Sequence, residues 1–453
     1  MYYPTERSGF MRAKSNNMIL LLTVGLLTLF ANCGIAVYFY PTFLTVLVPC
    51  VMGTAALPML AQRSPLGRQL WFLTHGNYCL KIFFISTVFS VIYQVFLGLL
   101  IAKEYTVMYL INLLICFGTL AVFFYIGIAI VYCTSSQLGL KLRIWGICLG
   151  VIPIVNIIAL VMILQETDKE IQLESEKELL NQRRQELQIC KTKYPILLVH
   201  GVFFRDFKYF GYWGRIPGQL KRNGASVYFG NQPSADAIAD CGQILTQRIK
   251  QITQETGCEK VNIIAHSKGG LDCRYAMAFC GAAPYVASLT TISTPHRGSS
   301  FADYMLTKVS PKNQNRFCSA YNKALNRLGE PEADLMTAVR ELTTEHCIEL
   351  DKRMAQPEGV LCQSFGSKMN KSLKGRFPMN FTGTVMGFIT QDNDGLVGAD
   401  SFQWGDNYTL LTSQSPVGIS HCDMTDLNRT NLPDFDVREF YVQLVAQLKE
   451  KGL

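Results

Sequence analysis

The chain has 453 residues, 49% of them hydrophobic, and a formal net charge of +8 at pH 7. Its basic residues flank apolar stretches and form no basic stripe with interleaved aromatic side chains, which argues against nucleic acid as a partner. No internal repeat, low-complexity tract or metal-ligand spacing of cysteines is present either. The composition therefore favours a membrane-bound chain.

The first 164 residues contain five apolar stretches without a charged side chain. Each is about as long as a hydrocarbon core requires, roughly 17–25 residues in a helix. A cleaved signal peptide is disfavoured, because the first stretch lacks a convincing cleavage site and further stretches follow. We expect a transmembrane domain at 1–164 with five helices, at Met18 to Tyr38, Phe43 to Leu60, Ile82 to Ala102, Val107 to Val131 and Ile144 to Leu164.

The basic residues of this region alternate from loop to loop. They lie before the first stretch, between the second and third, and between the fourth and fifth, whereas the other loops carry no excess positive charge. The positive-inside rule then predicts a cytoplasmic N-terminus. Five crossings would place the rest of the chain on the extracytoplasmic side. The basic residues of these alternate loops are Arg7, Arg12, Lys14, Arg63, Arg68, Lys81, Lys141 and Arg143.

A charged helix and a second domain are expected next. Residues 165–190 are rich in Glu, Gln, Lys and Leu. This composition predicts a charged helical linker at 165–192. In 193–453, short apolar strands alternate with helical patterns, which predicts a mostly parallel sheet covered by helices. The strands are expected near Ile196 to Val199, Ser226 to Phe229, Val261 to Ala265, Leu289 to Ile292, Thr384 to Thr390 and Tyr408 to Thr412.

The strand that begins at Val261 stops abruptly at a serine between small residues. Ala265 and Gly269 lie two residues before and after Ser267. A serine on a sharp strand-to-helix turn has a strained backbone, so its neighbours must be small. The usual pattern of such a nucleophile elbow is G-x-S-x-G, and alanine in the first place keeps the small volume. Ser267 is the predicted nucleophile.

The first strand of this domain ends in His200-Gly201 and opens a loop whose backbone can face a reacting carbonyl. Together with the residue after the nucleophile, this loop would supply an oxyanion hole. We expect its donors to be the backbone amides of Val202 and Lys268. His200 and His266 are expected to have positioning or packing roles.

The base and the acid should follow the serine in the order Ser, Asp, His. His421 lies between the last strand and the final helix, where the base is expected, whereas His296 and His346 are expected in structural and surface positions. Asp392 and Asp394 both follow an apolar stretch, and either carboxylate could orient the imidazole. An Asp-Asn-Asp-Gly run also suits a tight turn, and the pattern alone leaves these alternatives open.

Two segments around the serine have two interpretations each. Phe301 to Thr344 interrupts the alternation and is either a lid of amphipathic helices or an ordinary crossover. The aromatic loop from Phe203 to Trp213 either lines an acyl-chain pocket or packs in the core.

From about Tyr194 onward the chain resembles bacterial triacylglycerol lipases of the Pseudomonas type. The resemblance implies an α/β-hydrolase fold, with Asp394 rather than Asp392 as the acid. It also implies that Asp423, two residues after the histidine, binds calcium; a charge at a helix N-terminus is the alternative for Asp423. The matching stretches are His200-Gly201, Tyr212-Trp213 with Ile216-Pro217, Val261 to Gly270, Thr294 to Ser299 and Asn393 to Gly398.

The sequence therefore predicts a membrane-anchored serine lipase or esterase that cleaves esters of acylglycerol-type lipids through an acyl-enzyme. The expected triad is Ser267, Asp394 and His421, and the chemistry requires no cofactor, although structural calcium is possible. The alternatives are a membrane acyltransferase or phospholipase on the same fold, and a non-catalytic membrane scaffold. No protein partner can be identified from the sequence.

Overall fold

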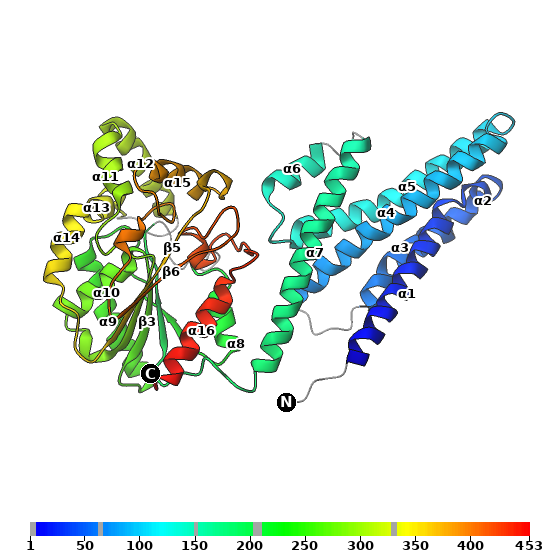
Figure 1. Ribbon diagram of the computed structural model, residues 1–453. Coiled ribbons are helices and arrows are strands. Elements are labelled where there is room, and N and C mark those ends of the chain that lie inside the picture. The colour runs from blue at the N-terminus through cyan, green and yellow to red at the C-terminus, as the bar shows by residue number, and fades with distance from the viewer. Residues whose placement is uncertain (1–5, 62–66, 149–152, 203–210, 328–332) are drawn as a thin grey trace. The chain divides into compact units, whose positions relative to one another are not determined.

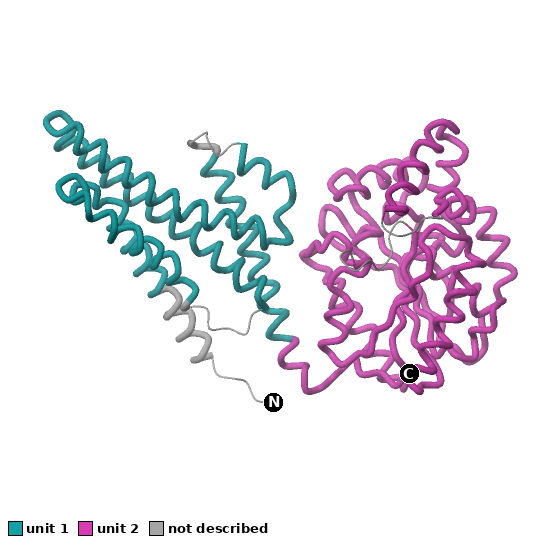
Figure 2. Tube along the Cα trace, turned by 180° about the vertical axis from the view of Figure 1, so that it is seen from behind, with its two compact units in different colours: residues 1–180 teal, residues 181–453 magenta. Residues whose placement is uncertain are grey.

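The computed structural model divides the chain into two compact units, Met1–Leu180 and Asn181–Leu453 (Figure 2). The first unit is helical, and the second contains a sheet with helices on both faces (Figure 1). The structure describes residues 6–61, 67–148, 153–202, 211–327 and 333–453.

Four helical segments among the described residues are long and apolar enough to cross a membrane: Met18–Phe39, Pro41–Met59, Arg68–Ile101 and Thr106–Thr134. They correspond to the first four predicted stretches. The elements of this unit are α1 (Glu6–Ala31), α2 (Gly34–Phe39), η1 (Pro41–Phe43), α3 (Leu44–Ala61), α4 (Arg68–Ile101), α5 (Thr106–Thr134), α6 (Leu140–Cys148) and α7 (Pro153–Arg184), the last of which continues into the second unit.

The fifth predicted stretch is divided between α6 and α7, and residues 149–152 between them lie outside the described residues. The polar part of α7 packs near the beginning of α4 and the end of α5. Asn77 Nδ2 donates to Thr167 Oγ1 over 2.6 Å. Glu170 accepts hydrogen bonds from the hydroxyl of Ser135 and the amide of Ser136. By Glu170 the chain has therefore returned to the end of the unit at which α5 ends.

The second unit is built on six parallel strands in the order β2-β1-β3-β4-β5-β6. This confirms the predicted mostly parallel sheet. The strands are β1 (Ile196–Val199), β2 (Val227–Phe229), β3 (Val261–His266), β4 (Val286–Ile292), β5 (Leu361–Ser367) and β6 (Asn407–Leu411).

Helices cover both faces of the sheet, which is why the central strands β1 and β3 are buried along their whole length and β1 is continuously apolar. Leu197 and Val199 pack with α9 (Ile238–Thr256) and α10 (Lys268–Phe279). Ile196 and Leu198 pack on the other face with α8 (Ile216–Arg222) and α16 (Val437–Glu450) (Figure 1). These layers, together with the elbow between β3 and α10, form an α/β-hydrolase fold.

The insertion after β4 is helical, as its pattern predicts. It contains α11 (Ser300–Lys308), α12 (Pro311–Arg327), α13 (Leu335–Glu341) and α14 (Thr344–Arg353). The remaining elements are short: η2 (Ala283–Tyr285), η3 (Ser372–Lys374), α15 (Met379–Gly387), η4 (Ala399–Ser401) and η5 (Asp423–Thr425).

One predicted strand is wrong. Thr384 to Thr390 lies in α15 and the turn after it, and β5 is the strand that precedes Asp394. The apolar residues of this stretch are compatible with either structure, but the buried positions Gly383 and Met386 are three residues apart, which is helical spacing.

Candidate active site

Ser267 lies on a sharp turn between β3 and α10. Its φ of 55° and ψ of −133° lie in a region that residues with a side chain rarely adopt. The amide of Ser267 donates to the carbonyl of Ile292 at the end of β4, over 2.9 Å. This bond ties the strained turn to the carboxyl edge of the sheet, where nucleophile elbows present their serine.

Two glycines let the loop after β1 lie against this turn. A Cβ atom on Gly201 would lie 2.6 Å from Cβ of Ser267, and one on Gly269 would lie 2.3 Å from the carbonyl oxygen of His200. The close approach brings Val202, which follows Gly201, next to the elbow. Lys268 is the first residue of α10. Val202 and Lys268 therefore both adjoin Ser267, and the role of their amides as oxyanion donors stays a prediction.

Replacing Gly201 by alanine is expected to lower kcat by roughly 100-fold or more, the effect of losing one oxyanion donor. The added methyl group would push the loop away from Ser267 and displace the Val202 amide. Gly218→Ala is the matched control, because nothing lies within 4 Å of a Cβ at that position. Steady-state kinetics of ester hydrolysis by the two variants measure the difference. Equal kcat values for Gly201→Ala and Gly218→Ala would show that the loop after β1 does not take part in catalysis.

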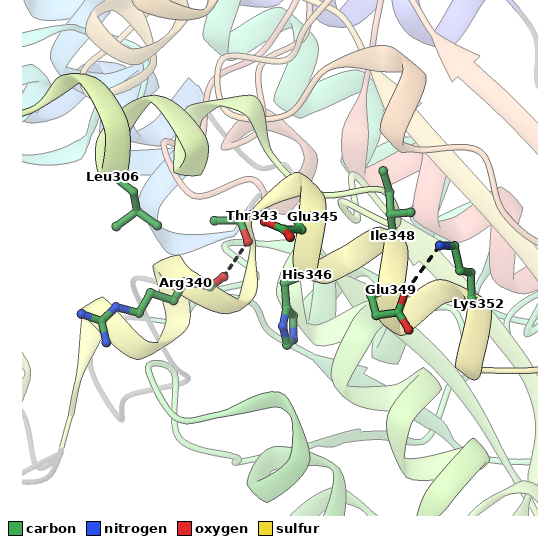
Figure 3. Close-up of a pocket in the computed structure, with 8 residues that line it drawn as sticks. All are labelled: Leu306, Arg340, Thr343, Glu345, His346, Ile348, Glu349 and Lys352. Atoms are coloured by element: carbon green, nitrogen blue, oxygen red, sulfur yellow. Dashed lines mark hydrogen bonds and ion pairs between the residues drawn. The ribbon is translucent and has the colours of Figure 1, made fainter.

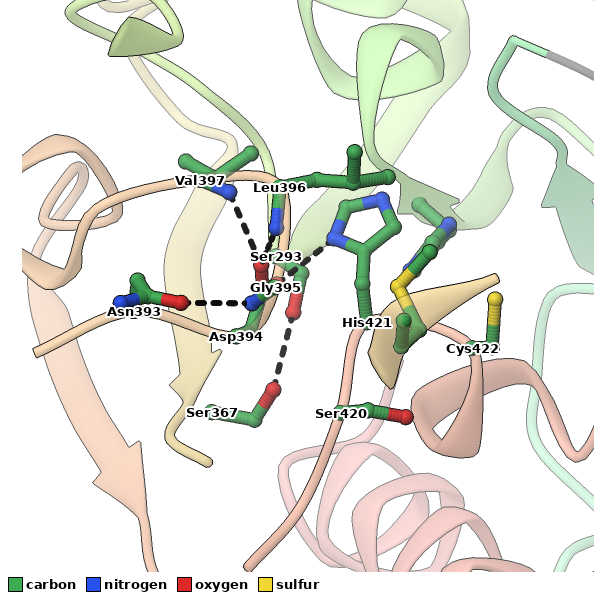
Figure 4. A network of polar contacts seen from close by, with 12 residues as sticks. Ser293, Ser367, Asn393, Asp394, Gly395, Leu396, Val397, Ser420, His421 and Cys422 are labelled. Carbon is green, nitrogen blue, oxygen red and sulfur yellow. Dashed lines mark hydrogen bonds and ion pairs between the residues drawn. The ribbon is translucent and has the colours of Figure 1, made fainter. Parts of the chain in front are cut away.

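Asp394 and His421 are joined directly (Figure 4). His421 Nδ1 lies 2.6 Å from Asp394 Oδ2, and the His421 amide donates to the Asp394 carbonyl. The amides of Leu396 and Val397 donate to the other carboxylate oxygen over 3.0 and 2.9 Å. Asp394 is fully buried and His421 nearly so. The carboxylate is thus held with one oxygen free to orient the imidazole.

Asp392, the alternative acid, points elsewhere. Its carboxylate forms an ion pair with Lys368 at 2.6 Å, and 46% of its side chain is exposed. Of the two carboxylates left open by the sequence pattern, only Asp394 is hydrogen-bonded to His421 among the contacts of the described residues.

His266, the residue before Ser267, packs against His421 with ring centroids 4.5 Å apart. Its Nδ1 lies 2.6 Å from the hydroxyl oxygen of Tyr212. Burial, and to a smaller extent His421, lowers the pKa of His266 well below its usual value. A neutral His266 does not repel the imidazolium that would form on His421 when it takes a proton.

The two buried histidines, His266 and His296, are expected to make the folded state less stable as the pH falls below about 6.5, the usual histidine pKa in an unfolded chain. Burial also lowers the pKa of His296 well below its usual value, with Arg274 and Arg297 adding to the effect. Both histidines stay neutral in the folded state and take up protons on unfolding. Each histidine should therefore lower the free energy of unfolding by about 1.4 kcal/mol for every pH unit below about 6.5.

Urea unfolding of the purified full chain between pH 5 and 7.5 measures the slope of the free energy of unfolding against pH. His266→Gln should remove about half of the part that the two histidines contribute. A slope that is unaffected by His266→Gln would show that His266 is not the neutral buried group described.

The other two downstream histidines lie where the sequence predicts. His296 is buried, its ring nitrogens lie 3.0 Å from Arg274 and Thr291, and it stacks on Trp404. His346 is exposed and lines an open surface pocket of about 820 Å³ with residues of α11, α13 and α14 (Figure 3). None of the candidate catalytic residues lines that pocket.

A buried ion pair beneath the elbow is a feature that the sequence analysis missed. Lys268 Nζ lies 2.7 Å from Asp272 Oδ1 and 3.4 Å from Cys241 Sγ. Both charged side chains are at most 2% exposed. Burial lowers the pKa of Lys268, but its negative neighbours, Asp272 first and then Cys241, together raise it above its usual value. Burial raises the pKa of Asp272 to about 7 although Lys268 opposes the shift, and we take the pair as ionised because the two side chains are in direct contact at 2.7 Å. The i, i+4 spacing of the two charges on the elbow helix was the available signal.

The insertion after β4 packs over the oxyanion loop. Val202 lies in one hydrophobic cluster with Cys318 of α12 and Leu335 and Ala338 of α13. The segment is thus placed as a lid would be, and its opening stays a prediction. Most of the aromatic loop predicted beside it, 203–210, lies outside the described residues, but Tyr212 and Trp213 are buried in the core.

Asp423, the residue at which the lipase resemblance implies calcium, is hydrogen-bonded within the chain, and calcium binding there stays a prediction. Its carboxylate accepts hydrogen bonds from the amide and hydroxyl of Ser420 over 2.9 and 2.6 Å. The neighbouring acid, Asp426, is held by the guanidinium of Arg215 at 2.7 Å. Among the described residues, no group of three or more His, Cys, Asp or Glu side chains is placed to hold a metal. Both Ser420 bonds go to the same carboxylate oxygen of Asp423, Oδ2, and a hard cation would need several oxygen ligands.

Comparison with known proteins relates this unit to lipases. Residues 195–333 match the palmitoyl protein thioesterase family. The chain is 38% identical over 165 residues to a triacylglycerol lipase of Pseudarthrobacter phenanthrenivorans, covering 34% of this chain and 51% of that protein. It is 28% identical over 294 residues to a triacylglycerol lipase of Pseudomonas fragi, covering 58% of this chain and 98% of that protein.

Among solved structures, the mature form of the Bacillus licheniformis lipase BlEst2 aligns with a TM-score of 0.42 at 22% identity, over 56% of this chain and 92% of that one. The chain spans about half the length of two of the bacterial lipases it matches, with 51% for the Pseudarthrobacter protein and 46% for one from Burkholderia plantarii. Over its second unit, which has an α/β-hydrolase fold, the chain is therefore similar to bacterial triacylglycerol lipases.

Proposed function

We propose that the chain is a membrane-anchored serine hydrolase that cleaves carboxylic esters of lipids. The observation that carries this proposal is the hydrogen bond between Asp394 and His421 at the edge of the sheet where Ser267 forms the elbow. The His266 ring links the two parts, since it precedes the serine and packs on His421. Lipase relatives favour a lipid ester as the substrate.

The reaction would proceed in two steps. His421 takes the proton of the Ser267 hydroxyl as the serine oxygen attacks the ester carbonyl, while Asp394 stabilises the imidazolium. The amides of Val202 and Lys268 hold the oxyanion, and His421 returns the proton to the leaving alcohol. Water, activated by the same histidine, then releases the acid from the acyl-enzyme.

Fluorophosphonate labelling of membranes that contain the full chain tests this proposal. We expect labelling that is abolished by Ser267→Ala and strongly reduced by His421→Ala. Folding of each variant is checked by its melting temperature. If the folded wild type does not label, the hydrolase proposal fails and a non-catalytic scaffold is favoured.

A thioester substrate is a second candidate, favoured by the match of residues 195–333 to palmitoyl protein thioesterases. Serine acyl transfer proceeds equally from an oxygen ester or a thioester, because both pass through the same acyl-enzyme. Measuring kcat/KM for long-chain acyl glycerides, phospholipids and acyl thioesters under identical conditions ranks these classes as substrates. Following the acyl group into free acid or into an added alcohol separates hydrolysis from acyl transfer.

For its location, we propose a multi-pass membrane protein whose second unit lies on the same side as the N-terminus. Five crossings would predict the opposite, extracytoplasmic side. The contacts of Glu170 with the loop after α5 support a return of the chain to the side where α5 ends. That side carries the basic loops and is cytoplasmic by the positive-inside rule.

Protease protection of a tag placed after Leu453 tests this orientation. In sealed cells the tag should resist added protease and should be lost once the membrane is permeabilised. Loss of the tag from sealed cells would instead support five crossings and an extracytoplasmic second unit.

The proposed chemistry needs no metal, and calcium removal is expected to leave activity within about two-fold. One oxygen of Asp423 accepts both Ser420 hydrogen bonds and Asp426 is paired with Arg215, so few carboxylate oxygens would be open to a hard cation. Ester hydrolysis before and after treatment with a calcium chelator measures this. A loss of activity that added calcium restores would instead support the calcium site that the lipase resemblance implies.

A further inference from the structure

The segment between β5 and Asp394 exposes large hydrophobic side chains to solvent. The exposed fractions are 80% for Leu373, 79% for Phe377, 66% for Phe381, 89% for Phe388 and 41% for Ile389. Grouped exposure of this kind marks an interaction surface in a soluble domain. Other exposed phenylalanines in the described part of the second unit are single and less exposed: Phe279 at 43% and Phe317 at 49%.

The same segment is basic. Lys371, Lys374 and Arg376 are exposed, and no acidic residue occurs between Met369 and Gln391. Aromatic side chains beside lysine and arginine suit the boundary of a bilayer, where rings enter the acyl region and cations meet anionic headgroups.

The segment also lies beside the proposed active site. Gly395, next to Asp394, packs against the sulfur atoms of Met369 and Met379, which a Cβ on Gly395 would approach to 3.1 and 3.2 Å. Met379 is the first residue of α15, and α15 packs against α11 of the lid-like insertion. Figure 1 shows α15 beside α11 at one end of the sheet. A lipid surface that met α15 would thus lie next to the candidate acid and the insertion.

We propose that residues 371–389, which we term the basic aromatic segment, dock onto a lipid bilayer surface with anionic headgroups. Phe377, Phe381 and Phe388 would insert at the acyl boundary, and Lys371 and Lys374 would contact the headgroups. The docking itself stands on exposure and charge. Its meaning for catalysis, delivery of a lipid ester from the bilayer to Ser267, rests on the proposed function.

Site-specific photocrosslinking of the full chain in vesicles tests the docking. The photoreactive residue p-benzoylphenylalanine replaces Phe388 in one variant and Phe279, an exposed phenylalanine outside the segment, in a control. In vesicles of phosphatidylcholine with phosphatidylglycerol, we expect a lipid adduct, detected by intact mass, at position 388 and little at position 279. Equal yields at the two positions, or an adduct of twice the chain's mass that assigns the surface to a second copy, would overturn the proposal.

Two further comparisons separate charge from catalysis. Combining Lys371→Gln with Lys374→Gln should reduce the adduct at position 388 at least about five-fold in these vesicles, and omission of phosphatidylglycerol should have a similar effect. Adding Ser267→Ala should leave the adduct unchanged, since docking needs no chemistry. An adduct that persists while fluorophosphonate labelling fails would therefore reject only the proposed function.

Discussion

Replacing Asp394 by asparagine is expected to lower kcat about 10⁴-fold, the effect of losing the acid of such a triad. The asparagine oxygen can still accept the amides of Leu396 and Val397, so the loop should keep its shape. Its NH₂ group would then face His421 Nδ1 and favour the tautomer that cannot accept the serine proton. Steady-state hydrolysis of a soluble ester measures the effect.

Asp392→Asn is the matched control for this experiment. Its ion pair with Lys368 is partly exposed, and such pairs contribute about 0–1 kcal/mol, so activity should change less than about two-fold. If Asp392→Asn lowered kcat as much as Asp394→Asn, the hydrogen bond between Asp394 and His421 would not be the one that catalysis uses.

Breaking the buried pair of Lys268 and Asp272 should destabilise the second unit by about 3–5 kcal/mol, since either single replacement leaves an unpaired charge in the core. Lys268→Met keeps the length of the side chain and the backbone amide. For a domain of this size the loss corresponds to a melting temperature lower by roughly 6–20 °C. Thermal unfolding of the full chain in detergent measures it.

The double variant Lys268→Met with Asp272→Leu should recover much of the loss, because it buries no charge. Lys352→Met is the matched control, since Lys352 pairs with Glu349 at the surface, where both side chains are more than 60% exposed. It should lower the melting temperature by less than about 2 °C. A Lys268→Met variant as stable as this control would mean that the buried pair is not ionised.

The strands of the second unit were largely predictable, and one failure among them is informative. Strands buried on both faces are short continuous apolar runs, and those at Val261 and Ile196 were recognised as such. The stretch from Thr384 to Thr390 has a similar composition but forms helix and turn, with Phe388 exposed. Composition does not distinguish residues that are apolar because they are buried from residues that are apolar at an exposed surface.

The sequence by itself determined the elbow at Ser267 and the first four apolar helices, because both depend on residues that are neighbours in the chain. Local sterics require small residues around the serine, and a membrane-spanning helix satisfies its own backbone hydrogen bonds. Only the tertiary structure separated Asp394 from Asp392 by direct contact, paired Lys268 with Asp272 in the core, and returned α7 to the end of α5 through Glu170. These features depend on distances between segments far apart in the chain, or on burial, and neither is visible in a local pattern.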